Sequence, residues 1–220
     1  MKIIFVNLFI VGDIHGCFFT FKTLLQRYWD EKNDLLIQVG DIIDRGNHTP
    51  QTISYCKELQ HKHQAVFLKG NHEFMAIKHL IGAGHEKWYN KYGKSVLWQY
   101  HFEDLTIDAD IEWMQRLPLF WENDFLFISH AGRSMSENYM VEDDPQSILW
   151  NKSGIKKLLK TQVIGHTPHQ NKKPIFYPET NTWNVDTGAY LGNCLSALKL
   201  DEKGNFIDFF SVSTLSKDIS

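Results

Sequence analysis

The sequence has few cysteines, and their spacing does not fit a disulfide framework. Three occur in 220 residues, at Cys17, Cys56 and Cys194, and none belongs to a Cys-x-x-Cys pair. An odd number of widely separated thiols argues against a disulfide-stabilised secreted domain and favours a reducing compartment. We therefore expect buried, inert thiols and a cytoplasmic protein.

Long hydrophobic runs are also lacking. No apolar segment approaches the roughly 20 residues that span a bilayer, so we expect no membrane partner. Residues 3–11 are apolar and follow a lysine, as in a secretory leader, but they run into Gly12-Asp13 without a small-residue cleavage site. A first core strand is the better interpretation of this segment.

A large excess of positive charge is absent too. The formal net charge is -3 and the pI is about 6.4, so no broad positive field would gather a polyanion, and we expect no nucleic-acid partner. With 43% hydrophobic and 22% charged residues, the length fits one compact domain over residues 1–220.

The first third of the chain repeats one pattern three times. An apolar run at residues 3–11, 35–39 and 65–68 is followed each time by a glycine-led polar turn and then a helical periodicity. This order is typical of parallel strands joined by helical crossovers, in a βαβαβ arrangement. Phe18, Phe21, Leu25 and Tyr28 mark one helix, and Pro50 marks the start of the next.

The rest of the chain changes character twice. Residues 74–122 are rich in aromatics and predict a helical cap segment, with a helix at 108–116 ended by Pro118. Short apolar runs then predict strands at 125–129, 163–164, 183–185, 195–200 and 206–212. Because short turns favour antiparallel pairing, we expect these strands to form a second sheet that packs on the first. The predicted fold is an α/β sandwich of two mixed sheets flanked by helices.

Five turns after predicted strands carry residues of the kind that bind metals. They read GDIHG at 12–16, GDIIDRG at 40–46, GNHE at 70–73, SHAG at 129–132 and GHTP at 165–168. Taken alone, each could be a turn or a helix cap. The carboxyl ends of neighbouring parallel strands meet at one edge of a sheet, so the turns should converge. Their mixed oxygen and imidazole donors suit manganese, iron or zinc better than calcium.

In this order the five motifs resemble the signature of the phosphoprotein phosphatase family, within the calcineurin-like metallophosphatases. The short chain resembles the bacterial and phage-type serine/threonine protein phosphatases, and the resemblance runs from residue 12 to about residue 189. It implies two divalent metal ions, with manganese as the working expectation and iron or zinc as alternatives. It also implies a hydroxide, shared by the metals, that attacks phosphorus in line. The implied ligands are Asp13, His15 and Asp41 for one ion, and Asp41, Asn71, His130 and His166 for the other.

The resemblance also assigns roles around the phosphate. His72 is implied as the general acid, with Asp44 orienting its ring and raising its pKa. Arg45 is the expected phosphate clamp, because a planar guanidinium bonds two oxygens at once, and Asn71 is expected to contact the phosphate as well. The alternative for Arg45 is a surface salt bridge.

The sequence departs from the family pattern at Lys152. The segment 148–152 resembles a Leu-Trp segment that usually ends in a second phosphate-binding arginine. Lysine keeps the charge but loses the bidentate geometry. Arg133 beside the SHAG turn could compensate, although an exposed and idle Arg133 is the preferred interpretation.

These features predict a metal-dependent phosphomonoester hydrolase, chiefly a protein serine/threonine phosphatase. Activity on phosphotyrosine is compatible with the same open metal site. Its partner would be a phosphorylated protein or a small phosphoester, and its oligomeric state stays open. The first alternative is a symmetrical diadenosine tetraphosphate hydrolase. The second is a non-catalytic metal-binding protein, which would have no need of an acid and a clamp.

Overall fold

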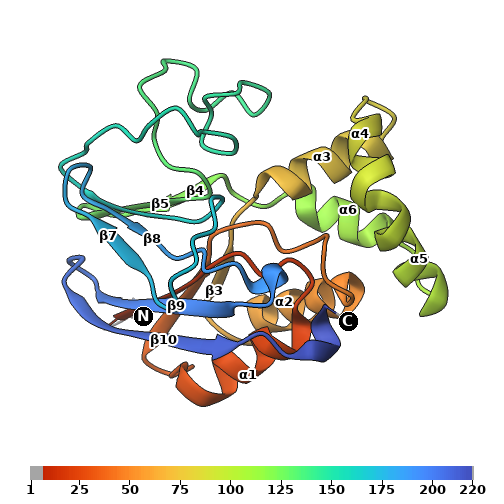
Figure 1. The fold of residues 1–220 in the computed structure, drawn as a ribbon, viewed down its shortest axis with the longest axis horizontal. Coiled ribbons are helices and arrows are strands. Elements are labelled where there is room, and N and C mark those ends of the chain that lie inside the picture. Colours follow the sequence, from red (N-terminus) through yellow and green to blue (C-terminus); the bar gives the residue numbers. More distant parts are fainter. Residues whose placement is uncertain (1–6, 220) are drawn as a thin grey trace.

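The computed structural model describes residues 7–219, which form two five-stranded sheets (Figure 1). In the first sheet the order is β10-β9-β1-β2-β3. The three N-terminal strands are parallel, and β9 pairs antiparallel with both β1 and β10. The strands are β1 Asn7–Val11, β2 Asp34–Gln38, β3 Ala65–Phe67, β9 Cys194–Asp201 and β10 Phe206–Ser213.

The second sheet has the order β4-β5-β6-β8-β7. Its three central strands are parallel, and β4 and β7 are antiparallel strands at the two edges. The strands are β4 Phe120–Glu122, β5 Leu126–Ser129, β6 Thr161–Ile164, β7 Ile175–Tyr177 and β8 Thr182–Asn184.

The predicted fold class is confirmed, but the expected pairing of the later strands is wrong in two ways. The β9–β10 hairpin joins the first sheet beside β1, and the connections between β5, β6 and β8 produce parallel pairs. These connections are long enough for crossovers, so the short-turn rule does not apply to them. The edge strands β4 and β7 were not predicted, because three-residue strands carry little periodic signal. Positions 3–6 of the first predicted strand lie outside the described residues.

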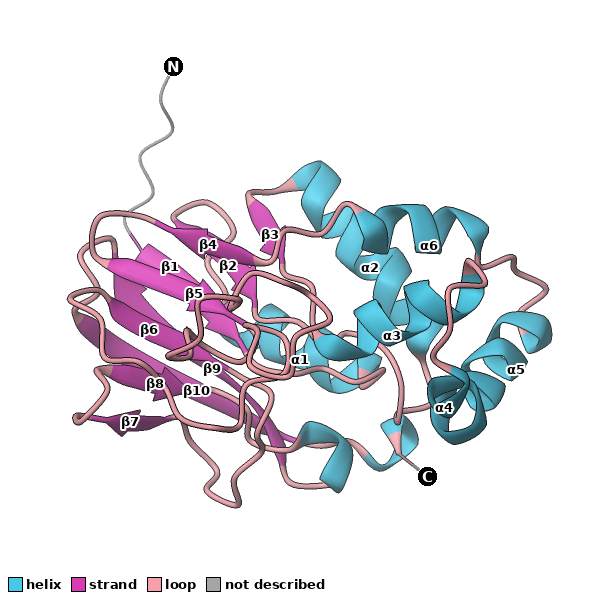
Figure 2. Cartoon of the chain, turned by 90° about the horizontal axis from the view of Figure 1, so that it is seen from above, coloured by secondary structure: helices cyan, strands magenta, loops and turns pink. Residues whose placement is uncertain are grey.

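The helices lie in two groups. In Figure 1, α1 and α2 cover the first sheet, while α3 to α6 lie beside the sheets. Figure 2, seen from above, shows the strands on one side of the molecule and the helices gathered toward the other. The predicted helix at 108–116 is confirmed as α6, and Pro50 lies in the first turn of α2. The bounds are α1 Phe18–Tyr28, α2 Thr49–Lys62, α3 Asn71–Leu80, α4 Glu86–Trp88, the π-helical η1 Tyr89–Gly93, α5 Lys94–Phe102, α6 Asp108–Gln115, and the short η2 Ala189–Leu191 and η3 Ser216–Asp218.

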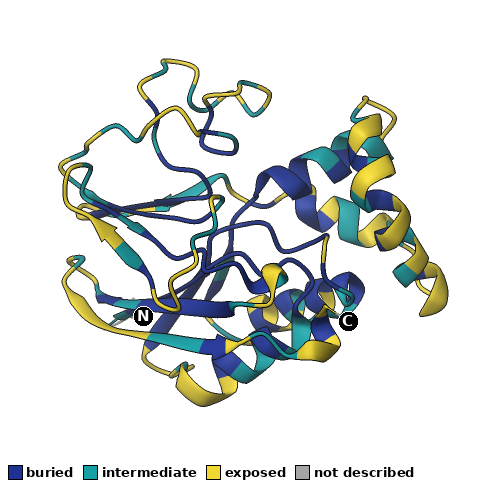
Figure 3. Cartoon of the chain, in the orientation of Figure 1, coloured by how far each residue is buried: buried dark blue, intermediate teal, exposed yellow. Residues whose placement is uncertain are grey.

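Alternation along β1 divides the core into two layers. Leu8 and Ile10 belong to the cluster between the two sheets, which also contains Val163 of β6. Phe9 and Val11 point the other way, into the cluster that packs against α1 and α2. Burial on both faces explains the nearly continuous hydrophobicity of this strand, and Figure 3 shows the buried centre.

The structure also bears on two of the expectations drawn from absent features, those for the cysteines and for membrane-spanning segments. The three cysteines are free and buried, as predicted, and burial raises the pKa of each thiol. Among the described residues, no helix combines the length and hydrophobicity needed to cross a membrane.

Candidate metal centre

The turns after β1 and β2 are joined by backbone hydrogen bonds. The amides of Ile14 and His15 donate to the carbonyl oxygen of Asp41, at 3.1 and 2.9 Å, and the amide of Gly46 donates to that of His15 at 3.0 Å. The two turns approach so closely that a Cβ at position 46 would lie 2.3 Å from the carbonyl oxygen of His15. Glycine is therefore required there, and the turns hold one another in place.

The Asp41 carboxylate lies between two groups of histidines. Its Oδ2 is 3.5 Å from Nε2 of His15 and 3.9 Å from Nε2 of His72, and its Oδ1 is 3.4 Å from Nε2 of His130. His15, Asp41 and His72 form one possible ligand group, and Asp41, His130 and His166 form another. In each group the ligand atoms lie within 4.8 Å of one another. Asp41 is the member that both groups share.

Two histidines are oriented by backbone carbonyls on their far side. Nδ1 of His15 lies 2.9 Å from the carbonyl oxygen of Ile43, and Nδ1 of His130 lies 3.0 Å from that of Val39. A carbonyl only accepts, so each Nδ1 donates, and in the neutral ring Nε2 keeps its lone pair facing Asp41. Metal-bound histidines are typically held in this way.

A second set of donors meets beside His130. Its Nε2 lies 2.9 Å from Oδ1 of Asn71 and 3.1 Å from Nδ1 of His166, and these two atoms are 3.0 Å apart. Nε2 of His166 is buried without a hydrogen-bond partner. Two imidazole nitrogens and an amide oxygen thus converge, and they are three of the four donors predicted for the second ion, Asp41 being the fourth.

Asp13 brings another buried carboxyl group to the centre. Its carboxylate accepts a hydrogen bond from the amide of His166 and is 2% exposed. Burial, followed by the charges of Asp186 and Asp41, raises the pKa of Asp13 well above its ordinary value. Burial opposes ionisation of Asp41 as well, but His130 and His72 hold its pKa well below its ordinary value. Buried carboxylates this close together are stabilised by cations, so the residues fit divalent metals.

His72 and Asp44 form a buried pair. Nδ1 of His72 lies 2.5 Å from Oδ2 of Asp44, which also accepts a 2.8 Å hydrogen bond from the indole of Trp88. Burial lowers the pKa of His72 to about 4 and raises that of Asp44. The direction for His72 is opposite to the sequence-based expectation, because burial of the ring outweighs the neighbouring carboxylates. Nη2 of Arg45 lies 3.1 Å from the other ring nitrogen, Nε2. A guanidinium only donates, so Nε2 accepts this hydrogen bond and the neutral ring carries its proton on Nδ1, toward Asp44.

Several of these residues have unusual backbone conformations. A positive φ is costly for a residue with a side chain and persists where the surrounding structure enforces it, often at functional sites. The candidate residues with positive φ are His15, Asp41, Asp44, Arg45 and His166, with values between 48° and 72°.

Lys152 lies beside the centre, and Arg133 does not replace it. A cavity of about 370 Å³ is lined by Asn71, His166, Trp150 and Lys152, together with two loop residues. Arg133 is half-buried, its guanidinium stacks 3.4 Å from the centre of the Tyr139 ring, and it donates to the carbonyl oxygens of residues 134 and 136. It organises its own loop, so the expectation of an exposed, idle Arg133 is wrong.

Sequence reasoning missed the role of Glu73. The buried carboxylate accepts from the amides of Gly70 at 2.7 Å and Asp41 at 2.9 Å, and from those of residues 42 and 43 at 2.8 and 3.1 Å. Burial raises its pKa to about 7, while the backbone N–H groups act in the opposite direction. Glu73 therefore ties the turn after β3 to the turn after β2. The Gly-x-x-Glu spacing of a capping box was the available signal.

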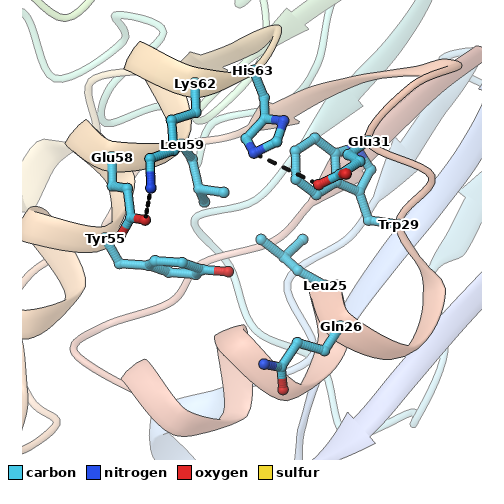
Figure 4. A pocket seen from close by; sticks show the side chains of 9 residues that line it. All are labelled: Leu25, Gln26, Trp29, Glu31, Tyr55, Glu58, Leu59, Lys62 and His63. Atoms are coloured by element: carbon cyan, nitrogen blue, oxygen red, sulfur yellow. Dashed lines mark hydrogen bonds and ion pairs between the residues drawn. The ribbon is translucent and has the colours of Figure 1, made fainter.

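Another cavity, of about 390 Å³, lies between α1 and α2 (Figure 4). Its charged side chains are paired with one another: Lys62 with Glu58 at 2.6 Å, and His63 with Glu31 at 3.6 Å. None of the candidate metal ligands lines it, so it is separate from the centre.

The chain is similar to known proteins in both sequence and fold. The family model for the calcineurin-like phosphoesterase matches residues 6–199. Serine/threonine-protein phosphatase 1 of Salmonella typhimurium is 30% identical over 212 residues, which cover 88% of this chain and 92% of that protein. An asymmetrical bis(5'-nucleosyl)-tetraphosphatase of Anoxybacillus flavithermus is 26% identical over 226 residues, covering 88% and 90%.

The fold has a close counterpart among solved structures. A crystal structure provisionally described as a diadenosine tetraphosphatase superposes with a TM-score of 0.67 at 19% identity, and covers 98% of this chain and 96% of that chain. This likeness concerns the fold, and the sequence matches confirm the family resemblance. The chain therefore belongs to the calcineurin-like phosphoesterase family, whose members are metal-dependent hydrolases of phosphoesters.

Proposed function

We propose that the protein is a phosphomonoester hydrolase with two divalent metal ions, and chiefly a protein serine/threonine phosphatase. The observation that carries the proposal is the position of Asp41. Its carboxylate lies between two groups of histidines, and His15 and His130 turn Nε2 toward it because their Nδ1 atoms bind backbone carbonyls. A carboxylate shared by two cations offsets their mutual repulsion.

In this proposal Asp13, His15 and Asp41 hold one ion, and Asn71, His130 and His166 hold the other together with Asp41. Manganese is the favoured metal, and iron or zinc suit the same donors. When bound, such ions supply Lewis acidity, which lowers the pKa of water and stabilises charge on the phosphate. The 3.9 Å distance between Nε2 of His72 and Oδ2 of Asp41 supports a role for His72 as the acid at the same centre.

His72 would deliver a proton from Nε2 to the leaving oxygen. Its Nδ1 donates to Asp44, so the carboxylate would stabilise the protonated ring, and loss of the proton from Nε2 would leave a neutral ring that still donates from Nδ1. In the structure Arg45 Nη2 donates to Nε2 of His72, so the guanidinium would leave this nitrogen for two phosphate oxygens, and Nε2 could then carry the proton that it delivers. Asn71 and Lys152 face the adjoining cavity and would bind the remaining oxygens.

A dinucleoside tetraphosphate hydrolase, of the symmetrical type, is the second candidate. The cavity beside His166 is lined by the aromatic ring of Trp150 and the ammonium of Lys152. An aromatic face stacks on a nucleobase, and a lysine suits an additional phosphate. The relative from Anoxybacillus flavithermus supports the same substrate class, although its name gives the asymmetrical type.

We also propose a cytoplasmic location, which the three buried free thiols support.

The first experiment measures hydrolysis of p-nitrophenyl phosphate by chelator-stripped protein with and without manganese. Activity should require the metal. His72→Asn should lower kcat by about two to four orders of magnitude, and Asp41→Asn should remove both bound manganese and activity. His61→Asn and Asp208→Asn, which change exposed residues, are the matched controls. Full activity without metal, or in both site variants, would contradict the proposal.

A second experiment separates the substrates. We would compare kcat/KM for a phosphoserine peptide and for diadenosine tetraphosphate, in the wild type and in Trp150→Leu. A protein phosphatase should have the higher kcat/KM for the peptide, and Trp150→Leu should leave that value nearly unchanged. A preference for the dinucleotide that is lost in Trp150→Leu would establish the second candidate instead.

A further inference from the structure

Two tyrosines flank the guanidinium of Arg45. The guanidinium carbon lies 3.9 Å from the ring centre of Tyr190 and 5.6 Å from that of Tyr92. Tyr190 belongs to η2, which follows the second sheet, and Tyr92 belongs to η1 in the helical segment. The fold therefore brings together two rings that lie about 100 residues apart in the sequence.

The same two tyrosine rings also contact His15 and His72. Tyr190 meets His15 edge to face, with ring centres 4.8 Å apart and an interplanar angle of 81°. Tyr92 lies against His72, also at 4.8 Å and with a tilt of 53°. Each tyrosine thus contacts both the centre and the arginine proposed to bind phosphate.

Arg45 needs such support because of its setting. The residue is exposed, has a φ of 70°, and follows Asp44, which also has a positive φ. A long exposed side chain on a strained turn has many rotamers, and arginine stacks on aromatic faces. The shorter distance makes Tyr190 the principal support, since cation–π contacts extend to about 6 Å.

We infer that Tyr190 is a positioning residue, which holds the Arg45 guanidinium beside the centre in an orientation ready to bind phosphate. Tyr92 contacts the guanidinium as a second, weaker support. The inference rests on the proposed function. It adds residues that the five motifs do not contain, and it gives the aromatic segment around residue 92 a role at the site.

The test compares Tyr190→Leu with Tyr190→Phe, using manganese-loaded protein and p-nitrophenyl phosphate. The leucine variant should raise KM about fivefold, the factor that corresponds to loss of a single cation–π contact, and should change kcat by less than about twofold. The phenylalanine variant keeps the ring but loses the hydroxyl, which also interacts with Arg45, so its KM should lie between those of the wild type and the leucine variant. Tyr92→Leu should have a smaller effect in the same direction, and Tyr28→Leu, far from the site, is the control.

Two further readouts exclude a merely structural role. In an Arg45→Ala background, Tyr190→Leu should raise KM no further, because the partner that it positions is gone. Inorganic phosphate, titrated calorimetrically into the manganese-loaded protein, should bind about fivefold more weakly to Tyr190→Leu than to the wild type. Equal melting temperatures of the variants would show that the fold is intact.

The outcomes separate this inference from the proposed function. A wild type that binds phosphate but hydrolyses nothing would overturn the function, and the phosphate titration would still decide the role of Tyr190. An unchanged KM and unchanged phosphate affinity in Tyr190→Leu would overturn the inference. So would a phenylalanine variant as impaired as the leucine variant, or equal effects of Tyr190→Leu with and without Arg45.

Discussion

At the scale of single residues, the centre depends on side chains whose orientation is fixed by hydrogen bonds to neighbouring groups. His15 and His130 are aimed by backbone carbonyls, and His72 by Asp44. Lys152 has no such fixed geometry, since an ammonium is a point charge on a flexible chain. The motif residues and their approximate neighbours were predicted from the sequence. The low pKa of His72 was not, because burial of the ring is decided by the whole fold.

Lys152→Arg should raise kcat/KM for p-nitrophenyl phosphate. A guanidinium can bond two phosphate oxygens where the ammonium bonds as a point charge, and we expect a gain of about three- to tenfold. Steady-state kinetics of the manganese-loaded protein measures it, with Lys160→Arg, in an exposed ion pair with Glu122, as control. An unchanged or lower value would rule out a phosphate-binding role for this position.

At the scale of elements, the helices and turns are joined by a few buried carboxylates. Glu73 at the start of α3 binds the amides of the turn that carries Asp41. Asp218 near the C-terminus accepts hydrogen bonds from the first-turn amides of α1 at 3.0 and 2.8 Å, and from the Thr20 hydroxyl at 2.6 Å. The prediction of an antiparallel second sheet was wrong at this scale, because short apolar runs do not specify which strands they pair with.

Glu73→Gln should destabilise the fold and weaken metal binding together. The glutamine NH₂ would face backbone N–H donors, so at least one hydrogen bond to a charged acceptor is lost, at a cost of about 2 kcal/mol. Urea denaturation gives the stability, and equilibrium dialysis gives the manganese bound per chain. Glu86→Gln, which changes an exposed residue, should alter neither. Wild-type stability with full manganese binding would exclude this role for Glu73.

Asp218→Ala should lower the free energy of unfolding by about 1 to 2 kcal/mol. The Cys17 side chain makes no capping hydrogen bond, so Asp218 supplies the cap of α1 and its negative charge lies at the positive end of the helix. Urea denaturation of Asp218→Ala and of Asp208→Ala, at an exposed position on β10, tests this. Equal loss in both variants would mean that the cap contributes nothing specific.

At the scale of the whole molecule, five turns from both sheets meet at one centre, so metal binding and folding should be linked. A ligand that binds only the folded state stabilises it by about 2.7 kcal/mol at one hundred times its Kd. For a chain of this size we expect manganese to raise the melting temperature by about 5 to 10 °C. Scanning calorimetry with manganese or with chelator measures the shift. Asp41→Asn should abolish it, and a shift that persists in this variant would place the stabilising ion elsewhere.

The sequence by itself determined the parallel N-terminal strands, the helices that follow them and the set of candidate ligands. These features are local: a strand buried on both faces must be apolar throughout, and the turn after it carries its polar residues within a few positions. The tertiary structure decided which strands share a sheet, how Glu73 joins two turns, and how Tyr190 and Tyr92 flank Arg45. Such contacts join residues tens to hundreds of positions apart, and many alternative pairings satisfy the same local pattern. Only packing of the complete chain selects among them, because burial and close approach are properties of the assembled core.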